Sequence, residues 1–180
     1  GSRFEPLTQV SLADLTGDLM RVGGTKNHTP EQLNYILEQK ASAIETSIDT
    51  ALGSASFTSL SYDLDKVFPL FAEVLQSPVF NEQQLDLQKT KLKGAIARRN
   101  DNPGQIANRE FSKLIYGENS PYARTVEYKN LNNISREDLI DFYSQYVRPE
   151  NIILGIVGDF EPIKMKSLIE QKFGNWQVKT

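Results

Sequence analysis

The sequence of 180 residues contains no cysteine and a single histidine, His28. These scarcities exclude a disulfide framework, iron–sulfur ligation, a cysteine nucleophile and most zinc sites, because those structures need several thiols or imidazoles. A net charge of −3 argues against a nucleic-acid binder that relies on neutralising phosphates. No apolar run approaches the ~20 residues that a helix needs to cross a bilayer, so no membrane span is expected.

The charges that are present lie unevenly along the chain. Residues 1–90 carry 6 basic and 12 acidic side chains, whereas residues 91–180 carry 14 basic and 11 acidic ones. Two interpretations stay open: a chance distribution over solvated helix faces, or a dipolar surface that steers a partner.

No repeat, low-complexity tract or Gly/Ser linker interrupts the sequence, so residues 1–180 are predicted to form a single domain. Apolar spacing and capping signals predict helices at 12–22, from 30 onward, 65–76, 81–102, over 106–115, at 135–146 and at 162–173. Alternation predicts strands at 41–49, 55–62 and 151–157, with the last the most strand-like run in the chain. Three strands are few for so many helices, so we expect additional strands before residue 1.

Local signals sharpen several of these boundaries. Thr29 is followed by Pro30 and by Gln32, the pattern of a capping box with proline in the first helical turn. Pro69 falls in the helix predicted at 65–76, where it is tolerated only within the first turn. Asn102, Pro103 and Gly104 are expected to break the long helix that begins after Asn81. Together the signals indicate a globular α+β domain.

Few side chains offer chemistry. Asp14 and Asp18 share one helix face, where they either hold a hard divalent ion or stand as exposed like charges. His28 has no partner ligands in the sequence pattern and is interpreted as structural or solvent-exposed. Arg98 and Arg99 end a helix, where they complement the helix dipole or contact an anion such as a substrate carboxylate. No active site is evident from these residues alone.

Several segments, taken together and in order, resemble the pitrilysin/insulinase family of zinc metallopeptidases, which includes the mitochondrial processing peptidases. They are Leu12–Met20 with the Gly-Gly-Thr run at 23–25, Leu75–Phe80, Arg98–Pro103, Tyr116–Gly117 with Ser120–Tyr122, Asn151–Phe160 and Phe173–Trp176. The resemblance covers nearly the whole chain. It implies an α+β fold with helices on one face of a mostly antiparallel sheet, preceded by strands that this chain lacks.

In catalytic members of that family the first helix reads His-x-x-Glu-His, with two zinc ligands and a general base. On this sequence those three positions fall on Asp14, Gly17 and Asp18. The third ligand and a supporting Glu fall on Ala95 and Gln88. The resemblance therefore implies a degenerate site: glycine cannot polarise water, alanine offers no ligand atom, and aspartates favour hard cations over tetrahedral zinc.

The family also implies a role for such a domain. A noncatalytic half helps to enclose an unfolded peptide substrate beside a catalytic domain or subunit, and zinc is expected only in that partner. Resemblance to bacterial members suggests a periplasmic or secreted protein. Two alternatives are an assembly module of the same fold without any proteolytic role, and a hydrolase that uses Asp14 and Asp18 with a hard metal ion.

Overall fold

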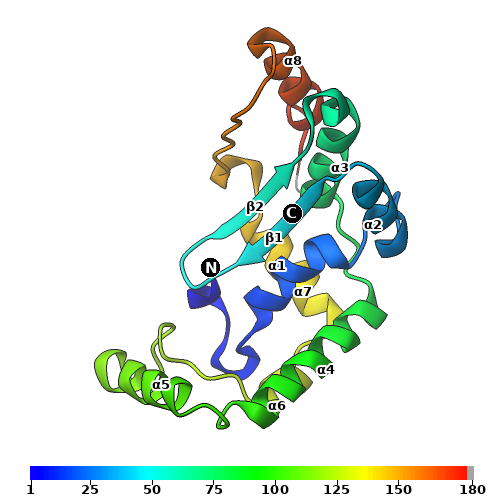
Figure 1. Ribbon diagram of the computed structural model, residues 1–180. Helices are drawn as coiled ribbons and strands as arrows, with labels where there is room; N and C mark the ends of the chain where they lie inside the picture. The colour runs from blue at the N-terminus through cyan, green and yellow to red at the C-terminus, as the bar shows by residue number, and fades with distance from the viewer. Residues whose placement is uncertain (178–180) are drawn as a thin grey trace.

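The computed structural model describes residues 1–177 and has a β-hairpin at its centre, with helices around it (Figure 1). The strands are β1 (Ala43–Ile48) and β2 (Gly53–Thr58), which pair antiparallel from Ala43 opposite Thr58 to Ile48 opposite Gly53. The helices are α1 (Leu12–Val22), α2 (Pro30–Gln39), α3 (Leu64–Gln76), α4 (Glu82–Arg98), α5 (Pro103–Tyr116), α6 (Tyr128–Asn132), α7 (Arg136–Tyr146) and α8 (Pro162–Phe173), and 3₁₀ turns occur at Ser2–Phe4, Leu7–Gln9, Ser61–Asp63 and Pro149–Asn151.

Alternation along β1 decides which face of the hairpin is covered. Ile44, Thr46 and Ile48 are buried, whereas the residues between them are exposed. Helix α1 packs against β1 and α7 packs against α1, while α3 packs against β2. The predicted arrangement, with helices on one face of an antiparallel sheet in an α+β fold, is confirmed.

Aromatic side chains connect the hairpin to the two helices at one end of the molecule. The ring of Phe57 on β2 lies 4.9 Å from that of Phe71 on α3, and the ring of Phe68 lies 5.7 Å from that of Phe173 on α8. Phe68 and Phe71 are almost completely buried. Burying each large side chain contributes roughly 1.5–3 kcal/mol, so this cluster fixes the position of α8 on the fold.

Most helix boundaries follow the sequence signals. The helices α1 and α8 begin and end at the predicted residues. The Thr29 side chain accepts a hydrogen bond from the Gln32 amide, and the reciprocal bond completes the capping box. Ser135 caps α7 through a hydrogen bond from the amide of Asp138. Among residues 1–177, no helix is sufficiently long and apolar to span a membrane.

The strand predicted at 151–157 does not form within the described residues. The segment is extended, but after the amide of Ile152 none of its backbone groups has a recorded hydrogen-bond partner there. Leu154 and Ile156 pack against the core, whereas Ile153 and Val157 are 99% and 101% exposed. The alternation was interpreted correctly, but a strand also needs a neighbour to pair with.

Pro69 does not meet the condition set from the sequence. Helix α3 begins at Leu64, so Pro69 lies beyond the first turn and inside the helix. A proline there removes one backbone hydrogen bond and costs about 3 kcal/mol. Val67 and Phe68 are fully buried beside it, and Phe71 is nearly so. Burial of this face outweighs the local cost and keeps the helix continuous.

Smaller differences affect β2, α4 and α6. The Asp49 carboxylate accepts hydrogen bonds from the amides of Ala51 and Leu52, so the turn is tight and β2 begins at Gly53 rather than residue 55. Helix α4 ends at Arg98, before the predicted residue 102. Helix α6 is absent from the helices predicted from the sequence, because five residues carry too little periodicity to indicate a helix.

Candidate functional site: a degenerate helix beside an arginine-lined cavity

The two aspartates on α1 lie on the outward face of the helix, as their spacing predicts. Asp14 is exposed and Asp18 is half-buried. Buried Glu5 holds the start of α1, because its carboxylate accepts hydrogen bonds from the amides of Ser11 and Ala13 at 3.2 and 2.9 Å. An anionic acceptor at a helix N-terminus satisfies amides that have no partner within the helix.

The surroundings of these two carboxyl groups raise their pKa values above the usual value for aspartate. Although the Asp14 residue is exposed to solvent, neighbouring protein atoms partly desolvate its carboxyl group and raise its pKa. Burial, with a further contribution from the negative charge of Asp14, raises the pKa of Asp18, and Lys91 on α4 opposes that shift. Desolvation and like charge both disfavour an ionised carboxylate. This face of α1 is thus a poor place for two free negative charges.

Gly17, the position that resemblance assigns to a general base, is pressed against the backbone of β1. A Cβ atom at residue 17 would lie 2.4 Å from the amide nitrogen of Ile48 and 2.7 Å from the carbonyl carbon of Ser47. The Thr46 hydroxyl donates a 2.6 Å hydrogen bond to the Gly17 carbonyl. Because these contacts involve strand backbone, a side chain at residue 17 requires α1 and β1 to separate.

The other two positions that the resemblance assigns to the family's zinc site lie on the helix next to α1. Helix α4 packs against α1, and Gln88 and Ala95 lie seven residues apart on one face of it. Lys91 lies between them in the sequence, and its positive charge acts on the pKa of Asp18 across the two helices. Gln88 is half-buried and Ala95 is exposed. The fold therefore brings the two helices together.

Metal ligation by this region has little support in the side chains present. Within residues 1–177, no three His, Cys, Asp or Glu side chains lie close enough to hold a metal ion. Asp14 and Asp18 on their own offer two carboxylates, whereas Mg²⁺ and Ca²⁺ sites usually gather six or more oxygen ligands. The arrangement gives no group placed to activate water.

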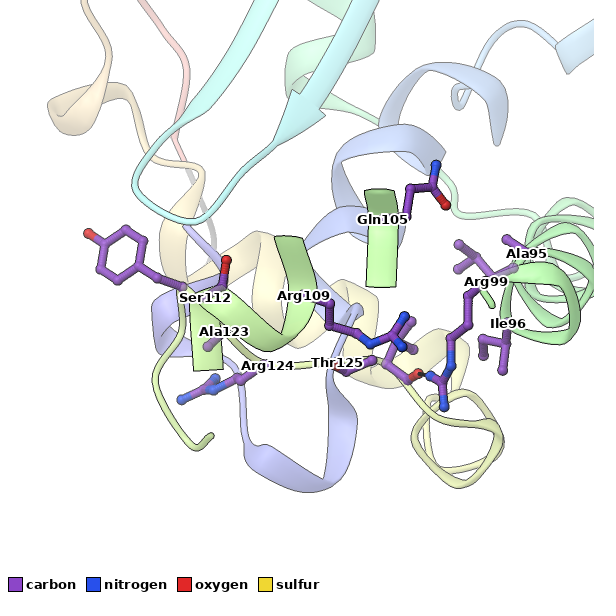
Figure 2. Close-up of a pocket in the computed structure, with 12 residues that line it drawn as sticks. Ala95, Ile96, Arg99, Gln105, Arg109, Ser112, Ala123, Arg124 and Thr125 are labelled. Atoms are coloured by element: carbon purple, nitrogen blue, oxygen red, sulfur yellow. Dashed lines mark hydrogen bonds between the residues drawn. The ribbon is translucent and has the colours of Figure 1, made fainter. Parts of the chain in front are cut away.

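A cavity of about 390 Å³ opens beside Ala95, between the end of α4, helix α5 and the segment 122–126 (Figure 2). Three arginines contribute to its wall: Arg99, Arg109 and Arg124. Leu92 and Ile96 of α4 form an aliphatic part of the lining. No acidic side chain is among the lining residues, although Arg99 and Arg109 form ion pairs with Glu127 and Glu110 outside the lining.

Sequence reasoning identified Arg99 but missed Arg109, Arg124 and the rest of this cavity. A signal was present in α5, where Gln105, Arg109 and Ser112 recur at spacings of four and three residues and all line the cavity. The apolar side chains of α5 instead face solvent, with Phe111 63% and Leu114 81% exposed. No residue of α5 is buried, so its polar side lines the cavity while its apolar side is exposed to solvent, which is unlike a typical amphipathic helix of a globular protein.

His28 has a structural role, as interpreted from the sequence. Its Nδ1 lies 3.2 Å from both carboxylate oxygens of Glu73 on α3, and the Thr25 hydroxyl donates to the same carboxylate. Burial alone would raise the pKa of Glu73, but hydrogen bonds from Thr25, His28 and the Asn27 amide outweigh it and hold that pKa below its usual value. The cluster ties the loop after α1 to α3.

Comparison with known families assigns the chain. A family model described as "Insulinase (Peptidase family M16)" matches residues 1–128, and one described as "Peptidase M16 inactive domain" matches residues 133–180. The first model alone covers well over half of the sequence. The chain therefore belongs to the insulinase family of peptidases, M16, as the resemblance predicted.

Individual relatives are distant. A protein from Rickettsia felis called "Uncharacterized zinc protease" is 23% identical over 118 residues, which are 64% of this chain and 28% of that protein. Rat "Cytochrome b-c1 complex subunit 1, mitochondrial" is 22% identical over 156 residues, which are 84% of this chain and 32% of that protein. The chain thus spans about a third of the length of these curated relatives.

Solved structures show the same fold. The crystal structure of a protease from Helicobacter pylori aligns with a TM-score of 0.84 at 24% identity, over 100% of this chain and 44% of that one. A peptidase M16 inactive domain from Pseudomonas fluorescens aligns with a TM-score of 0.71 at 26% identity, over 80% of this chain and 35% of that one. With the inactive-domain model, this similarity supports a noncatalytic M16 domain.

Proposed function

We propose that residues 1–180 act as a noncatalytic M16 domain that helps to enclose an unfolded peptide beside a zinc-bearing peptidase domain or subunit. In this role the chain binds no zinc itself. It forms part of the wall of a peptide-binding chamber that it shares with the catalytic domain or subunit, and it offers the edge of a strand to the peptide. The observation that carries the proposal is Gly17, because a side chain there would meet the backbone of β1. A general base at this position is incompatible with the observed packing of α1.

The open edge of β1 supports a role in peptide binding. Within the described residues, β1 pairs with β2 on one side only. The Arg21 side chain donates to the carbonyl of Ile44 at 3.1 Å, next to that edge. An unpaired strand edge offers backbone donors and acceptors to an extended peptide, which adds as a further strand.

The test joins metal analysis to cleavage of a quenched, unstructured peptide. After dialysis, the purified chain is expected to hold no stoichiometric zinc and to leave the peptide intact, with or without added Zn²⁺. Mixed with an M16 subunit from the same source that carries His-x-x-Glu-His, it is expected to increase cleavage by that subunit. Bound metal with activity that is lost in Asp18→Asn would overturn the proposal and favour a carboxylate active site.

A second candidate is an assembly module with no proteolytic role, which the similarity to a cytochrome b-c1 complex subunit favours. The same mixing experiment separates the two functions. An assembly module forms a stable complex with its partner but leaves peptide cleavage unchanged, whereas a chamber-forming domain changes the rate or the choice of peptide.

A further inference from the structure

The cavity beside Ala95 has the chemical character of an anion site. Figure 2 shows the side chains of Arg99 and Arg109 approaching each other from α4 and α5, near Thr125. Two guanidinium groups that share one cavity repel each other unless an anion lies between them. The lining includes no carboxylate, and the carboxylates that pair with these arginines, Glu127 and Glu110, lie outside it.

Each arginine is positioned by part of its donor set. Arg99 donates from Nη1 to the carbonyl of Val126 at 2.8 Å and from Nη2 to Glu127 at 2.7 Å. Arg109 donates from Nη2 to the side chain of Asn100 at 2.9 Å and from Nε to Glu110 at 3.3 Å. A guanidinium carries five N–H groups, so both side chains are held in place with donors left over.

The charge balance around the cavity remains positive after these pairs are considered. Glu127 forms an ion pair with Arg99 at 2.7 Å and Glu110 one with Arg109 at 3.3 Å, and Glu110 is shared with Lys113 at 3.1 Å. Arg124 donates its recorded hydrogen bonds to the backbone carbonyls of Ser2, Glu5 and Asn119 rather than to a carboxylate, although its charge also acts on the carboxylate of Glu5. An arriving anion is therefore attracted rather than excluded.

The remaining lining specifies the shape of the ligand. Leu92 and Ile96 offer aliphatic surface on the α4 side. The hydroxyls of Ser112 and Thr125 line the cavity and make no recorded hydrogen bond within residues 1–177. A group with a short aliphatic stem and a planar anionic head matches this combination, because guanidinium forks match carboxylate geometry.

We propose that the cavity binds a peptide carboxylate, from a glutamate side chain or a C-terminus, between Arg99 and Arg109 with its stem on Leu92 and Ile96. The proposal rests on the proposed function in one respect, namely that the carboxylate belongs to an enclosed peptide. It makes this chain a determinant of substrate choice, favouring acidic or C-terminal segments. It also accounts for the inward polar face of α5.

The direct test uses three small probes and amide NMR spectra of the ¹⁵N-labelled chain at low salt. N-acetylglutamate α-amide presents a side-chain carboxylate, N-acetylalanine a C-terminal one, and N-acetylglutamine α-amide none. We expect at least one carboxylate probe to shift the amides of Ser112 and Thr125, and the neutral probe to bind about tenfold more weakly or less. The stronger carboxylate probe identifies the source. Equal shifts by all three probes, or none by any, would overturn the proposal.

Two matched pairs of variants localise the effect. Arg109→Gln is expected to weaken carboxylate binding by about tenfold, whereas Arg98→Gln, which removes the same charge one residue outside the cavity wall, leaves it unchanged. Ala95→Glu places a carboxylate four residues before Arg99 and is expected to compete with the probe, whereas Ala95→Gln has the same size and does not. Equal losses within either pair would contradict an anion site.

A last measurement separates this site from the proposed function. The binding of an unstructured Gly/Ser peptide with one central Glu is compared with that of its Gln counterpart. If the small carboxylates bind but neither peptide does, the proposed function is refuted, whereas the proposal that the cavity binds a carboxylate is retained. If both peptides bind equally, peptide enclosure stands and the carboxylate site is refuted.

Discussion

The packing of Gly17 against β1 makes a quantitative prediction for Gly17→Ala. The added Cβ would lie 2.4 Å from the nitrogen of Ile48, whereas carbon and nitrogen atoms in contact prefer about 3.5 Å or more. The helix and the strand must then separate by about 1 Å. Overpacking of this kind costs roughly 1–3 kcal/mol, and alanine recovers roughly 0.5–1 kcal/mol of helix propensity. We expect a net loss of about 1–2 kcal/mol in the free energy of unfolding.

Gly94 provides the matched control on a neighbouring helix. A Cβ atom at residue 94 of α4 would meet nothing within 4 Å. Gly94→Ala should therefore raise the free energy of unfolding by roughly 0.5–1 kcal/mol through helix propensity alone. Urea denaturation followed by circular dichroism measures both variants under the same conditions. Shifts of the two midpoints in the same direction would refute the close packing of α1 on β1 and remove the main support for the proposed function.

Three further predictions concern stability. Ile153→Ser should change the free energy of unfolding by less than about 0.5 kcal/mol, because Ile153 is 99% exposed. Leu154→Ser should lower it by more than about 1 kcal/mol, because Leu154 packs against the core. Equal losses of stability in urea denaturation would contradict the alternation of buried and exposed residues. Asp18→Asn should be more stable than the wild type at pH 7, because burial and Asp14 raise the pKa of Asp18 in the folded state. Thermal scans should show this gain disappearing as the pH falls through that raised pKa toward 3.8. A gain in stability that persists at low pH would refute the prediction. Glu73→Gln should lower the free energy of unfolding by roughly 1–3 kcal/mol at pH 7 and by less in acid. The reason is that the ionised Glu73, whose pKa is lowered in the folded state, stabilises the fold only above that lowered pKa. An unchanged melting temperature at pH 7 would contradict this prediction.

Local signals in the sequence were sufficient for most helices. The ends of α1 and α8 and the capping boxes of α2 and α7 depend on residues within one or two turns, so they can be found without knowing the fold. The same holds for Asp14 and Asp18, because spacing alone places them on one helix face.

Where the sequence misled, a distant partner was decisive. The sequence pattern tolerates Pro69 only in the first turn of its helix, yet α3 continues through it because Val67 and Phe68 are buried. The run at 151–157 alternates like a strand, but its backbone pairs with nothing within residues 1–177. Hydrophobic periodicity indicates which secondary structure a segment is able to form, whereas strand pairing and burial depend on which other segments pack against it.

By itself, then, the sequence determined the fold class, most helix boundaries and the resemblance to M16 peptidases, because each rests on local pattern or on the order of short segments. Only the tertiary structure decided that Gly17 is closed off by β1 and that Arg99 and Arg109 share a cavity. For Gly17 the physical reason is distance along the chain, because it meets Ile48 through helix-on-strand packing. Arg99 and Arg109 are only ten residues apart, but they line one cavity because of the angle at which α5 leaves α4, and local patterns do not set that angle. No hydrophobic periodicity in the sequence includes both residues of either pair, so neither arrangement could be predicted from local patterns.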